Sequence, residues 1–178
     1  SANLENASWS VVAEQGRCEL THIIPYYGTA TFLRRPGSEM IFFVSTNREE
    51  AEPVDAVVES RPPRWDGLGE AQTLGRIELS AGRRPVYVRG GLALRLLYEL
   101  EEGREPTFRY ADWADREERV EVQLSTMRFR AGLDEFLACV ASLPPYLFEE
   151  VREETVYFAA GSTGVGPKGR SQIGRAHV

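Results

Sequence analysis

The stretch Cys18-Glu-Leu-Thr-His-Ile23 sets the interpretation of the whole chain. Its apolar and polar residues alternate, which is the pattern of a half-buried β-strand. Further short segments, separated by Gly or Pro, predict strands at residues 9–12, 29–34, 40–45, 54–58, 74–79, 86–88 and 107–110. A longer alternation, from Val120 through Val122 and Leu124 to Phe129, predicts one more. Many short strands with turn signals between them are typical of a sandwich or barrel.

Two segments follow a helical spacing instead. Residues 90–102 carry five leucines and end at Gly103, and residues 131–143 carry an apolar face that Pro144 must terminate. The sequence therefore predicts a mainly β (α+β) fold, an antiparallel β-sandwich or partial barrel with two packed helices.

The composition restricts the partners. The chain has 178 residues, 42% of them hydrophobic, which is enough for one domain and a fragment of a second. The net charge of −6 and the single lysine, Lys168, argue against a nucleic-acid surface. No window reaches the roughly 20 apolar residues that span a bilayer.

The two cysteines, Cys18 and Cys139, lie far apart in the sequence. They form either one long-range disulfide or two buried thiols, and their spacing leaves both possibilities open. A disulfide would indicate an oxidising compartment, and free thiols a reducing one.

The residues for catalysis or metal binding are sparse. On a strand, Cys18 and His22 share a face but lie about 13 Å apart, too far for a Cys–His nucleophilic pair. We expect a structural cysteine and a surface or half-buried histidine. Zinc needs about four ligands, and the acidic residues occur in solvated runs. The sequence therefore predicts that the protein is not an enzyme and binds no cofactor or metal. The competing hypothesis is an enzyme, such as a wall hydrolase.

Aromatic residues suggest binding rather than catalysis. Together with Arg61, Arg64 and Arg89, they are the residue types that dominate protein interfaces. We expect them in loops or at strand ends, and they are Trp9, Tyr26, Tyr27, Trp65, Tyr110 and Trp113.

An ordered set of short motifs resembles a known family. The motifs are Trp9, Cys18-Glu-Leu20, Tyr27-Gly28-Thr-Ala-Thr-Phe32, Arg35-Pro-Gly37, Pro62-Pro63-Arg64-Trp65, Gly103-x-x-Pro106, Tyr110-x-Asp112-Trp113 and Phe136-x-x-Cys139-x-x-x-Leu143-Pro144-Pro145. Over residues 7–150 this succession resembles the N-terminal domain of the MotY family of sodium-type flagellar proteins.

The resemblance implies a structural part of the T ring of the flagellar motor. It implies a periplasmic location, a Cys18–Cys139 disulfide, and docking on the basal body and on a MotX-like protein, so that stator units are recruited and anchored. For the interface we predict residues 62–67 and the region around Tyr110, with Arg64, Trp65 and Trp113 as contact residues. The alternative is an OmpA-type cell-wall anchoring protein unrelated to motility.

The resemblance also divides the chain. Residues 1–150 are predicted to form the docking domain, and residues 151–172 a linker and the first strand of a truncated OmpA-like domain. Peptidoglycan would then be bound only through the missing C-terminal part. The last six residues, 173–178, match the translation of a sequencing adapter and are predicted to be an artefact.

Overall fold

Five antiparallel strands form the first sheet of the computed structural model, which describes residues 9–63, 65–67 and 69–145. Alternation of buried and exposed residues along β2 gives this sheet an inner face of Cys18, Leu20, His22 and Ile24. The strand order is β1 (Trp9–Glu14), β2 (Arg17–Ile24), β3 (Gly28–Arg34), β4 (Ile41–Thr46) and β7 (Val86–Arg89). The predicted strands in this part of the chain are thus present, each with slightly different ends.

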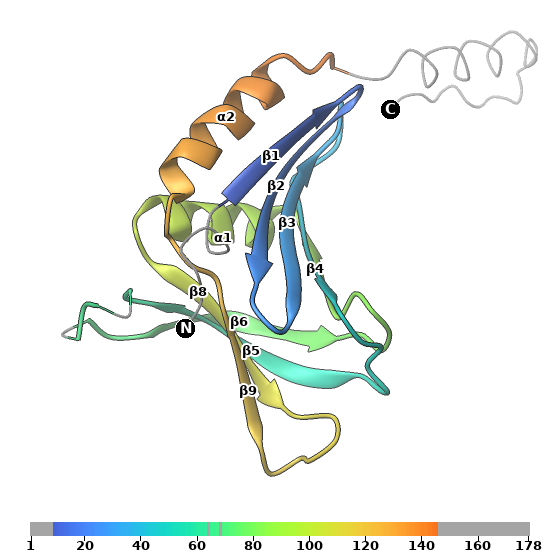
Figure 1. Cartoon of the computed structure of the whole chain (residues 1–178), viewed down its shortest axis with the longest axis vertical. Helices are drawn as coiled ribbons and strands as arrows, with labels where there is room; N and C mark the ends of the chain where they lie inside the picture. The colour runs from blue at the N-terminus through green and yellow to red at the C-terminus, as the bar shows by residue number, and fades with distance from the viewer. Residues whose placement is uncertain (1–8, 64, 68, 146–178) are drawn as a thin grey trace, which may run out of the picture. The chain divides into compact units, whose positions relative to one another are not determined.

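A second antiparallel sheet of four strands packs against the first (Figure 1). Its order is β6 (Gln72–Leu79), β5 (Val54–Arg61), β8 (Glu105–Ala111) and β9 (Arg119–Gln123). Phe42 of β4 stacks on Phe108 of β8 with ring centroids 5.9 Å apart, and both side chains are fully buried. Burial of each such ring contributes about 1.5–3 kcal/mol, so the contact between the sheets is the centre of the core.

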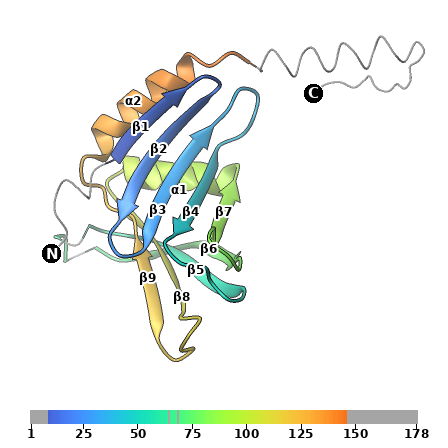
Figure 2. The ribbon, with the colours of Figure 1, turned by 45° about the vertical axis from the view of Figure 1, so that its right-hand side comes forward.

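Helix α1 (Gly91–Glu101) crosses the inner side of the five-stranded sheet (Figure 2). It packs against β7, β8 and helix α2, and it buries Leu96, Leu97 and Leu100. Gly103 follows the helix at φ +87°, a left-handed conformation that favours glycine. The predicted end of this helix is therefore confirmed.

Helix α2 (Phe129–Ala141) covers β1 and β2 and is joined to the first sheet by a disulfide. Cys18 of β2 and Cys139 of α2 form this bond, with their Cα atoms 6.0 Å apart. A loop of this length constrains the unfolded chain by about 4–5 kcal/mol on the loop-entropy model. The indole N–H of Trp9 donates to the Ser125 carbonyl at 2.7 Å and joins β1 to the segment before α2.

One predicted strand is too long. The alternation from Val120 to Phe129 belongs to two elements, because β9 ends at Gln123 and α2 begins at Phe129. The chain turns between them, and Arg128 adopts φ +57° without a glycine to mark the turn. Phe129 therefore packs edge-to-face on Trp9, with ring centroids 5.2 Å apart, as the first residue of a helix.

The mainly β fold with two helices is confirmed, and within residues 9–145, apart from the two gaps, the sheets do not close into a barrel. All strands and helices belong to one compact unit within residues 9–34 and 38–142. No helix in this described part is long and apolar enough to cross a membrane. Residues 151–172 and 173–178, predicted as a linker with a first strand and as an artefact, lie outside the described residues.

Candidate docking site

The turn between β2 and β3 carries two adjacent tyrosines, Tyr26 and Tyr27. The Tyr27 N–H donates to the Ile24 carbonyl at 3.0 Å, and Pro25 and Tyr26 are the two central residues. Pro at the first central position and a positive φ at the second define a type II turn. Gly28 follows, and a Cβ there would lie 1.8 Å from the Ser45 carbonyl oxygen, so only glycine allows β3 to approach β4 here.

Tyr26 occupies the turn position that normally belongs to glycine. Its φ is +63°, and its side chain is fully exposed, with a relative accessibility of 101%. A residue with a Cβ in this conformation costs about 1 kcal/mol relative to a relaxed backbone. The fold therefore carries a strained, solvent-exposed aromatic ring that contributes nothing to its core.

Tyr27, in contrast to the exposed Tyr26, takes part in the contact between the two sheets. Its hydroxyl shares a hydrogen bond of 2.6 Å with the hydroxyl of Tyr110 on β8, so the pair links the two sheets. Burial raises the pKa of Tyr27 to about 12, although the hydrogen bond from Tyr110 acts against this rise. Burial also raises the pKa of Tyr110.

Trp113 extends this linked pair into the loop between β8 and β9. Its ring packs edge-to-face on Tyr110 at 4.8 Å, and its indole N–H donates to the Glu52 carbonyl. The Asp112 carboxylate accepts the Ala114 N–H at 2.8 Å and fixes the loop locally. A cavity of about 350 Å³ lies next to these rings, and Tyr26 and Tyr27 also line it. We call it the second cavity, to distinguish it from the larger one described below.

Trp65 stands in the loop between β5 and β6. Its side chain is 70% exposed, which is unusual for the largest apolar residue type. The loop turns back where the Asp66 N–H donates to the Pro63 carbonyl at 2.9 Å. Trp65 is therefore exposed to solvent next to this hydrogen bond.

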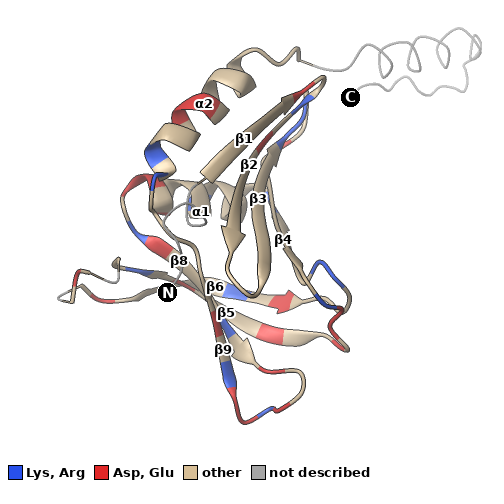
Figure 3. Cartoon of the chain, in the orientation of Figure 1, with Lys and Arg blue, Asp and Glu red and all other residues tan. Residues whose placement is uncertain are grey.

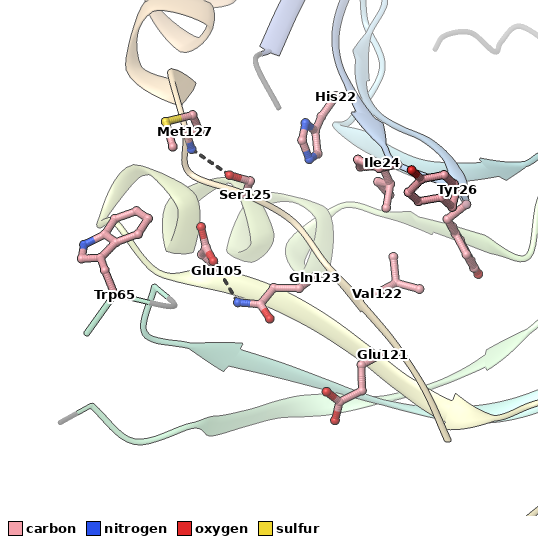
Figure 4. A pocket seen from close by; sticks show the side chains of 12 residues that line it. His22, Ile24, Tyr26, Trp65, Glu105, Glu121, Val122, Gln123, Ser125 and Met127 are labelled. Atoms are coloured by element: carbon pink, nitrogen blue, oxygen red, sulfur yellow. Dashed lines mark hydrogen bonds between the residues drawn. The ribbon is translucent and has the colours of Figure 1, made fainter. Parts of the chain in front are cut away.

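A cavity of about 580 Å³ lies between Trp65 and the tyrosine turn, and we call it the aromatic groove. Figure 4 places Trp65 at one end and Tyr26 at the other, with β9 along the side between them. Its lining is His22, Ile24, Pro25, Tyr26, Tyr27, Trp65, Glu105, Glu121, Val122, Gln123, Ser125 and Met127. This volume is that of a site for a small ligand or for a few side chains of a partner.

Glu105 supplies a buried carboxylate to the groove. Its side chain accepts hydrogen bonds from Gln123 Nε2 at 2.8 Å and from the Thr126 N–H and Oγ1 at 2.7 and 3.0 Å. Glu105 is only 3% exposed, and these three donors are neutral. A negative charge is thus held in one place at the groove by groups that do not cancel it.

Charged residues recur along the strands of the four-stranded sheet, whereas the middle of β1–β4 is mostly uncharged (Figure 3). Arg61 pairs with Glu121 at 2.8 Å and with Glu59 at 2.9 Å, and Arg109 also pairs with Glu59. The Arg61 hydrogen bond lowers the pKa of Glu121. Burial acts to raise the pKa of Glu59, but the hydrogen bonds from Arg109 and Arg61 outweigh it and the pKa is lowered.

Two of the four predicted contact residues are accessible in the structure. Trp65 lines the aromatic groove, and Trp113 is half-buried beside the second cavity. Tyr110 is only 3% exposed, so its ring packs between the sheets and is not itself presented to a partner. Arg64 lies outside the described residues. An interface role for this set remains a prediction.

His22 is buried, with 2% of its surface exposed, and was wrongly expected at or near the surface. It stacks on Trp9, with ring centroids 4.8 Å apart, because its register partner across β1 and β2 is this tryptophan. Trp9 is likewise a core residue. Within the described part of the chain, no group of three or more His, Cys, Asp and Glu side chains is placed to hold a metal ion.

Sequence reasoning counted Tyr26 among the interface-type aromatic residues but not among the contact residues, and it missed Glu105. The signal for Tyr26 was present, because Pro25-Tyr26-Tyr27-Gly28 puts a bulky residue after proline in a hairpin turn. Glu105 gave no local signal, since its role depends on Gln123 and Thr126, which lie 18 and 21 positions away.

Comparison with known proteins identifies the family. The model of the MotY N-terminal domain matches residues 1–145. The chain is also 33% identical over 153 residues to the sodium-type flagellar protein MotY of Vibrio parahaemolyticus serotype O3:K6 (strain RIMD 2210633). The chain belongs to the MotY family. The alignment covers 84% of this chain and 52% of that relative, so the chain spans about half the length of the MotY protein it matches.

Proposed function

We propose that this member of the MotY family is a docking domain of the flagellar motor. It forms part of the T ring, binds the basal body and a MotX-like protein, and thereby helps to recruit and anchor stator units. The match to the MotY N-terminal domain over residues 1–145 carries this proposal. The aromatic groove and Trp113 supply residue types that dominate protein interfaces, so the domain acts by non-covalent docking rather than by catalysis.

The proposed location is the periplasm. The Cys18–Cys139 disulfide supports it, because such bonds persist in oxidising compartments and are rare in the cytosol. Protein taken from cells under alkylating conditions should show no free thiol after denaturation without reductant. Two alkylated cysteines would contradict a periplasmic location.

The proposed domain organisation is a docking domain at residues 1–150 followed by the entry into an OmpA-like domain. The strand-like residues 155–158, predicted from the sequence, and the 52% coverage of the relative support this division. In this arrangement, peptidoglycan is bound only through the C-terminal domain.

A deletion strain of the source organism tests the function. Hook-basal bodies from this strain should lack the ring and the MotX-like protein, and the cells should not swim. The wild-type gene should restore all three. Normal rings and motility in the deletion strain would favour a wall-anchoring protein unrelated to motility.

A further inference from the structure

The aromatic groove has the features of a binding site that the fold itself does not need. Trp65 and Tyr26, at its two ends, are 70% and 101% exposed. Tyr26 holds a left-handed backbone conformation that glycine adopts without strain. A bulky ring held at such a strained position points to a function outside the folded core.

The charge of the groove restricts the partner. Among the described residues of its lining, the acidic side chains are Glu105 and Glu121, and none is Arg or Lys. Arg61 pairs with Glu121, whereas Glu105 is held by neutral donors only. The groove therefore favours a cation, as does the net charge of −6.

The aromatic rings complement the same cation. Trp65 and Glu105 both line the groove, so a partner bound there can present a charged group to the carboxylate and to the indole ring (Figure 4). Trp and Tyr faces attract guanidinium and ammonium groups, and the aliphatic part of such a side chain packs on the apolar lining. Neighbouring apolar residues, Ile24, Val122 and Met127, provide that lining.

We propose that the aromatic groove binds an arginine or lysine side chain carried on a segment of a basal-body protein. The proposal rests on the docking function above and names the chemistry of the partner. Residues 1–8 of this chain contain one glutamate and no basic residue, so they lack the required charge. Occupation of the groove by a second copy of this chain, or by its own residues 1–8, would contradict the proposal.

The first test measures binding of the purified chain to hook-basal bodies isolated from the deletion strain. Tyr26→Gly and Trp65→Ala should each weaken binding about 10-fold or more. Tyr98→Ala, which removes an exposed aromatic ring from α1, is the matched control and should leave binding unchanged. Wild-type affinity for both groove variants would overturn the inference but not the docking function. Failure of the wild-type chain to bind would contradict the docking function itself.

The second test concerns charge. Glu105→Gln keeps the size of the side chain and one of its two accepting oxygens, and together with Glu121→Gln it should weaken binding about 10-fold and reduce its dependence on salt. Asp134→Asn with Glu135→Gln, two exposed residues of α2, changes the net charge equally and should have little effect. Unchanged or tighter binding by the Glu105/Glu121 variant, with its folding confirmed by circular dichroism, would exclude a basic partner segment.

Photo-cross-linking from position 26 in cells identifies the occupant. An adduct with a basal-body protein, mapped to a segment that bears Arg or Lys, is the expected result. A cross-linked dimer of this chain, or a link to its own residues 1–8, would contradict the proposal.

Discussion

The aromatic groove and the second cavity are neighbours, yet their aromatic rings have different relations to the fold. In the second cavity, Tyr27 and Tyr110 are joined by a hydrogen bond between the two sheets, and Trp113 packs on Tyr110. In the groove, Trp65 and Tyr26 are exposed at the ends of the cavity. An aromatic ring near the surface is thus used either to join the sheets or to contact a partner, and burial distinguishes the two.

Replacement of the buried ring should have the largest effect on stability. Tyr110→Ala removes a side chain that packs between the sheets, so we expect the free energy of unfolding to fall by about 3–5 kcal/mol. Urea denaturation followed by circular dichroism measures this loss. Tyr98→Ala, on the exposed side of α1, should change the value by less than about 0.5 kcal/mol. Equal urea midpoints for Tyr110→Ala and Tyr98→Ala would contradict the distinction between a buried, structural ring and an exposed one.

Removal of one hydroxyl from the linked pair should have an intermediate effect. Tyr27→Phe leaves the Tyr110 hydroxyl without its partner, and Tyr110→Phe does the reverse, so each should cost about 1–3 kcal/mol. The double variant should lose less than the sum, because the second change removes a group that is already unsatisfied. Additive losses would show that the two hydroxyls do not interact in solution.

The same pair should make stability depend on pH in the alkaline range. The pKa of Tyr27 is raised from 10.0 to about 12 in the folded protein, so its contribution is complete below pH 10.0. Between these two values the unfolded chain releases its proton and the folded chain keeps it, so stability falls as the pH rises. Unfolding free energies of the wild type should fall more steeply across this window than those of Tyr27→Phe/Tyr110→Phe. Parallel curves for the two proteins would be the contrary result.

Changes in the groove should have the smallest effect on stability. Tyr26→Gly relieves the positive φ but loosens the unfolded chain, and these terms offset each other to within about 1 kcal/mol. Trp65→Ala should cost no more than about 1 kcal/mol because its side chain is exposed. Thermal unfolding with both variants would reveal a structural role for these rings if either melted far below the wild type.

The strands and helices were largely predictable because they depend on local patterns. Alternation along β2 and β5 and the leucine spacing of α1 are read from neighbouring residues. The end of β9 was missed because the turn before Phe129 contains neither glycine nor proline. Alternation holds from Val120 to Leu124 and then shifts by one residue at Met127, and the predicted strand overlooked this shift.

The site was only partly predictable because it depends on how the sheets pack. Trp65 was correctly named as an exposed aromatic residue of its loop. Tyr110 was predicted as a possible interface residue at a strand end, although it shares a strand face with Phe108 and so points inward. The groove brings together β2, the β5–β6 loop, β8 and β9, and no spacing along the chain records that arrangement.

Fractionation of basal bodies tests the central claim most directly. A deletion strain would express either the wild-type protein or the Tyr26→Gly/Trp65→Ala variant, and immunoblots would measure each in the hook-basal-body fraction. The account predicts that the wild-type protein is found in this fraction, whereas the variant is equally abundant and folded in the periplasm but lost from it. Retention of the variant at the wild-type level would contradict docking through the aromatic groove.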